Sequence, residues 1–141
     1  MKAGLAAVLA LGLLACEKKP RWDDGVRFKA VQLNKTCPQA IDEATTATSA
    51  SYDDGVFTIK YTLSDDFLKN FNMNKNKFLV GMRDAALRDF CGDVLLWDGM
   101  DVFREHHGTY KRIYFAENGE KFGEATVVAD ECPPAKVAKG Y

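Results

Sequence analysis

The sequence lacks the motifs that mark nucleophilic and redox catalysis. It has no Gly-x-Ser-x-Gly motif, which would place a nucleophilic serine on a strand-to-helix turn. It has no Cys-x-x-Cys pair, which would indicate thiol–disulfide exchange. The residues Ser49, Ser51 and Ser64 fall in strand, turn and helix-cap contexts instead. We therefore expect a protein that is not an enzyme and that needs no cofactor.

An excess of basic charge is missing as well. The chain of 141 residues carries 19 Lys and Arg against 20 Asp and Glu. Proteins that bind nucleic acid usually carry surplus Lys and Arg to neutralise phosphates, so we expect no nucleic-acid partner. There is no internal repeat and no low-complexity segment. The length therefore fits one domain with a core of moderate size.

Metal-ligand spacing is also absent. His106 and His107 are adjacent, and adjacent residues of a helix point about 100° apart, so both rings cannot easily face one ion. The His-x-x-x-His spacing of helical zinc sites does not occur. Several carboxylates nearby could form an acid–base pair only in an apolar pocket that separates their pKa values. These carboxylates are Asp93, Asp98, Asp101 and Glu105. We expect a solvated helix surface and no metal site.

The apolar run at the N-terminus is too short to cross a membrane as a helix. It covers about 13 residues from Ala3 to Ala15, whereas a transmembrane helix needs about 20. Lys2 precedes the run, and the small Ala15 stands before Cys16, as signal-peptide cleavage requires. The sequence Leu13-Leu14-Ala15-Cys16 resembles the lipobox of bacterial lipoprotein precursors, which implies acylation of Cys16. The alternative is an ordinary cleaved signal peptide followed by a coincidental cysteine.

Acylation at Cys16 would divide the chain into four parts. We expect a signal peptide at residues 1–15, a lipid-anchored tether at 16–27, an α+β domain at 28–132 and a C-terminal tail at 133–141. Glu17 follows Cys16, in place of the Asp that is associated with inner-membrane retention in enteric lipoproteins. We therefore expect a membrane-anchored lipoprotein that faces the periplasm, at the outer membrane in preference to the inner membrane.

Three other cysteines would remain in this oxidising compartment, namely Cys37, Cys91 and Cys132. Sequence alone permits three pairings, each leaving one thiol over. Cys91 ends the predicted main helix and Cys132 follows the last predicted strand, so a bridge between them would join the helices to the sheet. We choose this pairing for that topological reason. Its loop of about 40 residues would stabilise the fold by about 4 kcal/mol in the chain-entropy model.

Two hairpin signals enclose a helical block. Residues 56–63 alternate strictly between apolar and polar, and Asp53-Asp54-Gly55 separates them from a Thr- and Ser-rich segment at 45–52. Asn118-Gly119 lies between the strand-like segments 109–115 and 122–128. This order predicts a two-layer α+β domain with a sheet of about four antiparallel strands, packed against two or three helices.

The helical block itself has several parts. Ser64 is a predicted N-cap followed by two carboxylates, and the Asn-rich stretch 70–76 interrupts the helix. An amphipathic helix then runs from Phe78 to Phe90 and stops at Gly92. Another short apolar helix is expected from residue 94 to about residue 108. A further short helix is expected between residues 38 and 44.

Aromatic side chains gather in the second half of the chain. Their simplest role is packing in the core and across strands. Two apolar helices on a sheet can also leave a groove for a partner helix. The candidate lining of such a partner-binding groove is Trp97, Phe103, Tyr110 and Tyr114.

The order of elements in the second half suggests a family. A helix ends in Leu87-Arg88-Asp89-Phe90-Cys91, a short helix runs to Gly108, an aromatic strand follows as Tyr110-Lys111-Arg112-Ile113-Tyr114, and a turn with Gly119 leads to a final strand and Cys132. This arrangement, over about residues 45–132, resembles the small lipoprotein pilotins of type II secretion, beta type. It is also similar to a wider set of secreted domains with the same order. Cys37 and a longer polar tether depart from the pattern.

The resemblance implies an α+β domain, a disulfide between Cys91 and Cys132, and binding to the C-terminal helix of a secretin subunit. We therefore expect a non-catalytic, membrane-anchored lipoprotein that binds another cell-envelope protein, with a pilotin that assists secretin assembly as its most specific form. The alternative is an exclusion or inhibitor lipoprotein of the envelope, of the kind encoded by plasmids or phages.

Overall fold

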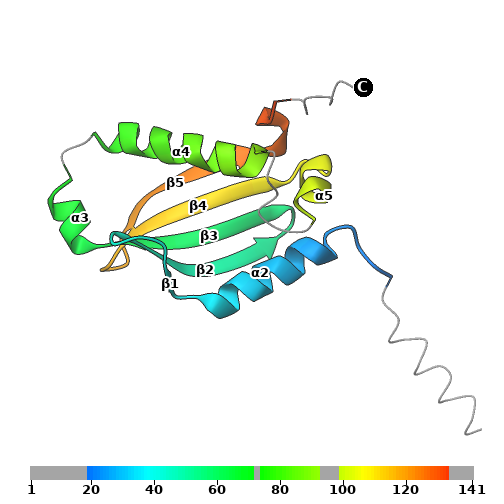
Figure 1. The fold of residues 1–141 in the computed structure, drawn as a ribbon, viewed down its shortest axis with the longest axis horizontal. Coiled ribbons are helices and arrows are strands. Elements are labelled where there is room, and N and C mark those ends of the chain that lie inside the picture. The colour runs from blue at the N-terminus through cyan, green and yellow to red at the C-terminus, as the bar shows by residue number, and fades with distance from the viewer. Residues whose placement is uncertain (1–18, 72–73, 93–98, 134–141) are drawn as a thin grey trace, which may run out of the picture.

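A twisted five-stranded sheet carries the helices on one of its faces (Figure 1). The computed structural model describes residues 19–71, 74–92 and 99–133. The strands lie in the order β1-β2-β3-β4-β5. They are β1 (Gln39–Ala40), β2 (Thr45–Asp53), β3 (Val56–Leu63), β4 (Thr109–Ala116) and β5 (Lys121–Val128). The structure confirms the α+β class that the sequence predicts.

Both predicted hairpins are present. Strands β2 and β3 pair in antiparallel fashion, and so do β4 and β5. Asp54 and Gly55 at the first turn both have positive φ, at 45° and 79°, as a two-residue loop of the type favoured in hairpins requires. Gly119 at the second turn has φ of 88°. The local turn signals in the sequence therefore fixed the register of each hairpin.

The prediction of a four-stranded, all-antiparallel sheet was wrong in two details. The short strand β1 adds a fifth strand beside β2, and β3 pairs with β4 in parallel. Val56 lies opposite Thr109 and Leu63 lies opposite Ala116. The chain leaves the end of β3 through the helices α3 (Asp65–Lys69), α4 (Lys75–Cys91) and α5 (Met100–Glu105). These helices carry it back to the start of β3, so the two strands must run in the same direction.

The first helix among the described residues, α2 (Asp24–Thr36), begins before the predicted domain boundary at residue 28. Val26 and Ala30 are buried against the sheet, and Leu33 packs beside them, a spacing that places one apolar stripe on the helix. Its last residues lead to β1, where the sequence analysis expected a helix over residues 38–44. Between β1 and β2, the Asp42 carboxylate accepts a hydrogen bond from the Ala44 N–H, and this local bond favours a turn over a helix.

The helical block follows the prediction where the structure describes it. The Ser64 hydroxyl accepts a hydrogen bond of 3.2 Å from the Phe67 N–H and thereby caps α3. The Asn-rich stretch separates α3 from α4, and α4 ends at Cys91. The predicted start of the next helix, at residues 94–97, lies outside the described residues. Helix α5 begins at Met100.

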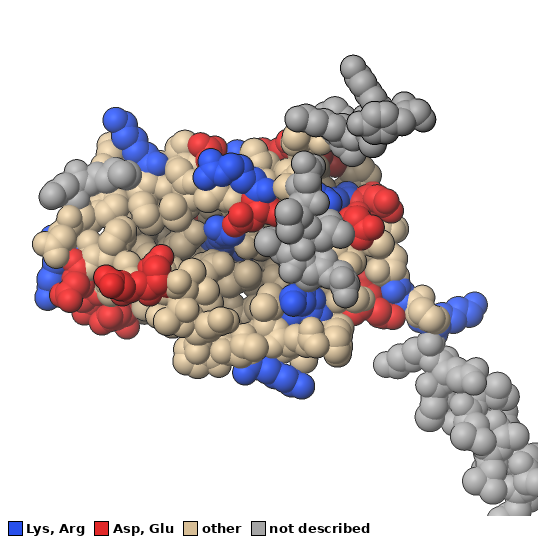
Figure 2. Space-filling model, in the orientation of Figure 1, with Lys and Arg blue, Asp and Glu red and all other residues tan. Residues whose placement is uncertain are grey.

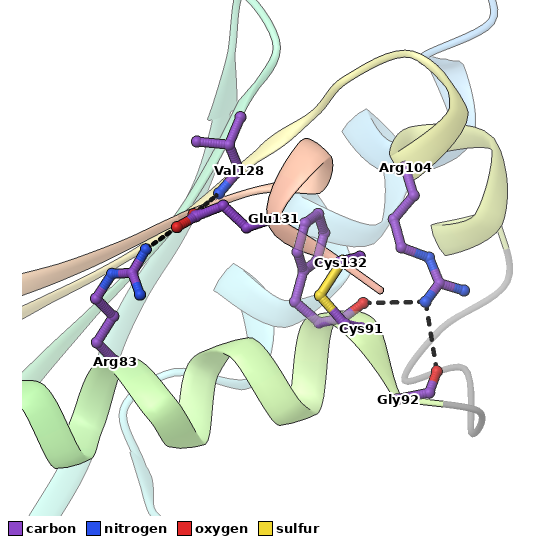
Figure 3. The surroundings of a disulfide bond; sticks show 8 residues. Arg83, Cys91, Gly92, Arg104, Val128, Glu131 and Cys132 are labelled. Carbon is purple, nitrogen blue, oxygen red and sulfur yellow. Dashed lines mark hydrogen bonds and ion pairs between the residues drawn. A yellow bond between two sulfur atoms is a disulfide. The ribbon is translucent and has the colours of Figure 1, made fainter. Parts of the chain in front are cut away.

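The predicted disulfide between Cys91 and Cys132 is confirmed (Figure 3). It joins the end of α4 to the residue that follows the 3-10 turn η1 (Ala129–Glu131). Arg104 of α5 donates hydrogen bonds to the carbonyls of Phe90 and Gly92, at 3.2 and 3.3 Å. It thereby supplies donors to backbone carbonyls at the C-terminal end of α4, where the helix itself supplies none. Three segments therefore converge on this end of the helix. Among the described cysteines, Cys37 has a free thiol and is half-buried.

Candidate functional site

A groove runs between α2 and α4 on the helical face of the sheet. Helix α2 packs on β2 and helix α4 packs on β5, so β3 and β4 lie between the two helices. Figure 2 shows this face as mostly uncharged and hollowed between the two helices. We call this feature the interhelical groove. Its floor is formed by the side chains of β3 and β4 that alternate toward the helices.

A pocket lies beside the α3 end of the interhelical groove, lined by α3, the first turns of α4 and the turn between β1 and β2. It has a volume of about 940 Å³. The apolar wall consists of Phe67, Phe71, Phe78 and Met82, and the remaining lining consists of Glu43, Ala44, Ser64, Asp66 and Asn70. Pockets that bind apolar ligands or partner helices combine such apolar walls with a few polar groups at the rim.

An aromatic cluster supports this wall. The rings of Phe67 and Phe71 both lie against Phe78, with centroids 5.8 and 5.4 Å away. Phe122 of β5 packs edge-on against Phe71 and Phe78, and Tyr114 of β4 packs edge-on against Phe78 at 6.2 Å. Edge-to-face geometry at these distances is favourable. Phe67 of α3 and Phe71, which follows α3, therefore contact α4 and also line the pocket.

The middle of the groove floor carries a buried cation. Arg112 of β4 donates to the Tyr110 hydroxyl at 2.9 Å and to the Asp89 carboxylate of α4 at 2.5 Å. Its side chain is 13% exposed, whereas the side chain of Asp89 is 47% exposed. Burial alone would lower the pKa of Arg112, but Tyr110 and Asp89 raise it, so the guanidinium stays charged. Burial raises the pKa of Tyr61.

Three of the four residues predicted to line a groove lie beneath the surface. Phe103, Tyr110 and Tyr114 are almost fully buried, at 0, 2 and 3% exposure. Phe103 and Tyr110 pack with Phe90 in the hydrophobic core. Tyr110 and Tyr114 on the helical face of β4, and Phe103 on α5, fill the space between the sheet and the helices. Tyr114 also packs against Phe78 of the groove wall, and Trp97 lies outside the described residues.

Sequence reasoning missed Phe67 and Phe71 as site residues. They flank the end of α3, a helix of only 5 residues, which shows no amphipathic repeat. The available signal was the spacing of three phenylalanines around the Asn-rich interruption, at positions 67, 71 and 78. Polar residues separate these phenylalanines in the sequence, so the contacts of Phe67 and Phe71 with Phe78 depend on how α3 lies against α4.

A second, smaller cavity lies where the N-terminal segment meets the first hairpin. It has a volume of about 360 Å³, and its lining includes Arg21, Trp22, Asp23 and Tyr52. Asp23 is 2% exposed and accepts hydrogen bonds from Tyr52 and Arg27. Burial alone would raise the pKa of Asp23, but these hydrogen bonds outweigh burial and lower it. Asp23 therefore stays ionised and fixes the start of α2.

Each of the two histidines contacts one side chain from another part of the chain. The His106 ring stacks on Trp22, with centroids 4.0 Å apart, and His107 Nδ1 lies 2.5 Å from an Asp130 oxygen. Residues 19–71, 74–92 and 99–133 contain no group of three His, Cys, Asp or Glu side chains arranged to hold a metal. Within the same residues, no helix combines the length and apolarity needed to cross a membrane.

No known family profile and no curated protein sequence matches the chain. Three solved structures are similar in fold. A secreted protein from Pseudomonas aeruginosa has a TM-score of 0.59 and 11% identity, covering 82% of this chain and 100% of its own. The type II secretion pilotin EpsS from Vibrio vulnificus has a TM-score of 0.58 and 13% identity, covering 80% of this chain and 93% of its own.

The type II secretion pilotin AspS from Vibrio cholerae has a TM-score of 0.51 and 12% identity, and the match covers 75% of this chain and 87% of that chain. At these identities the likeness extends to the fold and leaves the individual site residues unmatched. The resemblance to beta-type pilotins that the sequence suggested is therefore confirmed at the level of the fold.

Proposed function

We propose that this chain is a non-catalytic lipoprotein that binds a helical segment of another cell-envelope protein in the interhelical groove. The observation that carries the proposal is the apolar wall of Phe67, Phe71, Phe78 and Met82 beside a pocket of about 940 Å³. An amphipathic helix is about 10 Å across and buries its apolar stripe in such grooves. The fold shared with two type II secretion pilotins favours a secretin subunit as the partner.

Membrane attachment is the second part of the proposal. Acylated Cys16 would lie about six residues before Trp22, which already contacts the domain through His106. Six extended residues span about 20 Å, so the anchor would hold the groove close to the membrane surface. Intact mass measurement of the membrane-extracted protein should show acyl chains on Cys16, and Cys16→Ser should remove them. An unmodified Cys16 would remove the anchor from the proposal.

The partner is tested by capture and by deletion. The lipidated protein should bring down a secretin from envelope extract, and secretin multimers should fail to reach the outer membrane when its gene is deleted. Met82→Asp should abolish capture because a carboxylate would be buried against the partner's apolar stripe. Val80→Asp is the matched control, because Val80 lies on the same helix and is 60% exposed. Normal secretin assembly in the deletion strain would contradict the pilotin role.

A further inference from the structure

The floor of the interhelical groove holds a charge that an apolar helix would not need. Arg112 lies opposite Ile59 of β3 in the parallel pair, on the helical face of the sheet. Its neighbours on this face are Tyr61 and Tyr114, whose rings stack with centroids 5.3 Å apart. Tyr114 in turn packs against Phe78 of the groove wall. Tyr61 and Tyr114 therefore lie between the Arg112 guanidinium and Phe78 of the apolar wall.

The charge on Arg112 is only partly balanced from within the chain. Asp89 is its ion-pair partner among the described residues, and the Asp89 side chain is 47% exposed against 13% for Arg112. Water weakens the attraction of an exposed carboxylate, whereas Arg112 has lost most of its hydration. A guanidinium has five N–H donors, more than its three side-chain partners Tyr110, Asp89 and Tyr114 engage. A second carboxylate would complete the set.

We propose that Arg112 selects the occupant of the interhelical groove, a helix that carries one Asp or Glu within its apolar stripe. This inference rests on the proposed function, because it specifies the chemistry of the helix bound there. The carboxylate would lie over β4, between the half-exposed Asp89 and the stacked tyrosines, while neighbouring apolar side chains fill the space beside Phe78 and Met82. A fork of two N–H groups toward a carboxylate also fixes the direction and register of the bound helix.

Binding of a helix that lacks a carboxylate would carry an electrostatic cost at Arg112. When the groove is covered, Arg112 loses its remaining water, and a helix without a carboxylate would leave the charge with Asp89 alone. Burying an incompletely paired charge opposes binding, so helices of similar apolar character but lacking the acid are rejected. A helix with Lys at that position would be rejected more strongly by like-charge repulsion.

The test uses the purified full chain and synthetic peptides that cover the C-terminal region of the secretin from the same genome. Each peptide is made in its native form and with Asp and Glu changed to Asn and Gln. We expect the native peptide to bind, the amide peptide to bind at least about tenfold more weakly, and Arg112→Gln to bind both forms alike. Lys111→Gln is the matched control, because Lys111 is the neighbouring residue of β4 and its side chain alternates to the opposite face.

Arg112→Lys adds a variant that keeps the charge but loses the fork, and it should retain part of the preference for the acidic peptide. Equal binding of the native and amide peptides to the unmodified protein would overturn the role of Arg112 and leave the groove in place. Failure of the native peptides to bind at all would overturn both the groove as the binding site and this inference.

Discussion

The Tyr52 hydroxyl donates a hydrogen bond of 3.0 Å to the Asp23 carboxylate and joins the end of β2 to the residue before α2. The segment next to the proposed lipid anchor is therefore part of the folded domain. Asp23 has a pKa below its ordinary value, so the native state favours its ionised form. This contribution to stability is complete above the ordinary pKa of about 4 and is lost as pH falls through the lowered value.

Acidification should accordingly loosen the N-terminal segment below about pH 4, and Asp23→Asn should loosen it at neutral pH. Hydrogen exchange of residues 19–36, expressed as protection factors, measures both effects. Asp53→Asn is the control, because Asp53 lines the same cavity and is exposed. Unchanged protection in Asp23→Asn would show that the carboxylate does not hold the helix.

The disulfide between Cys91 and Cys132 should contribute to the free energy of unfolding. Replacing Cys91 and Cys132 with Ser should lower the free energy of unfolding by about 4 kcal/mol, because the bridge closes a loop of 41 residues in the unfolded chain. Urea titrations with and without reductant measure the difference. Cys37→Ser should leave the unfolding midpoint nearly unchanged, since that thiol is free. Peptide mapping that finds Cys37 in the bridge would contradict this assignment.

The distinction between core and groove can be tested by paired substitutions. Phe103→Ala should lower the free energy of unfolding by about 3–5 kcal/mol, because its ring is completely buried. Met82→Asp should cost much less stability, because Met82 lies half-buried at the groove wall. Chemical denaturation of the two variants checks the order. A larger loss of stability in Met82→Asp than in Phe103→Ala would place Met82 in the core.

Two glycines should respond to Ala in opposite directions. A Cβ on Gly108 would lie 2.2 Å from the Phe103 ring, so Gly108→Ala should cost about 1–3 kcal/mol. A Cβ on Gly81 would meet nothing within 4 Å on the exposed side of α4, so Gly81→Ala should gain about 0.5–1 kcal/mol of helix stability. Thermal unfolding of both variants tests the close contact between Gly108 and Phe103.

The sequence predicted the features of the fold that depend on neighbouring residues. The alternation of Val56 to Leu63, the Asn118-Gly119 turn and the Ser64 cap each act within a few residues, and each is present. The parallel pairing of β3 with β4 depends on a crossover of about 45 residues, whose direction no local pattern encodes. Helix α2 was not predicted at all, and its first residues were assigned to the tether because Asp23, a buried carboxylate, resembles a tether residue until Tyr52 and Arg27 are placed beside it.

The candidate site was less predictable than the fold. A sequence can show that Phe103, Tyr110 and Tyr114 are aromatic, but burial is decided by which strand lies in the middle of the sheet and which helix covers it. Arg112 was not predicted as a site residue, because a charged residue in a strand is usually assigned to the solvent-facing side of the sheet. Strand alternation places Arg112 on the face of Tyr110 and Tyr114, but its position opposite Ile59 follows only from the register of the parallel pair.

Site-specific photocrosslinking in living cells tests the groove as the binding surface most directly. A photoreactive amino acid at position 82 lies in the groove wall, and one at position 80 lies on the exposed side of the same helix. We expect a crosslink to a secretin subunit from position 82 and none from position 80. No crosslink from position 82, or equal crosslinking from both positions, would contradict binding in the interhelical groove.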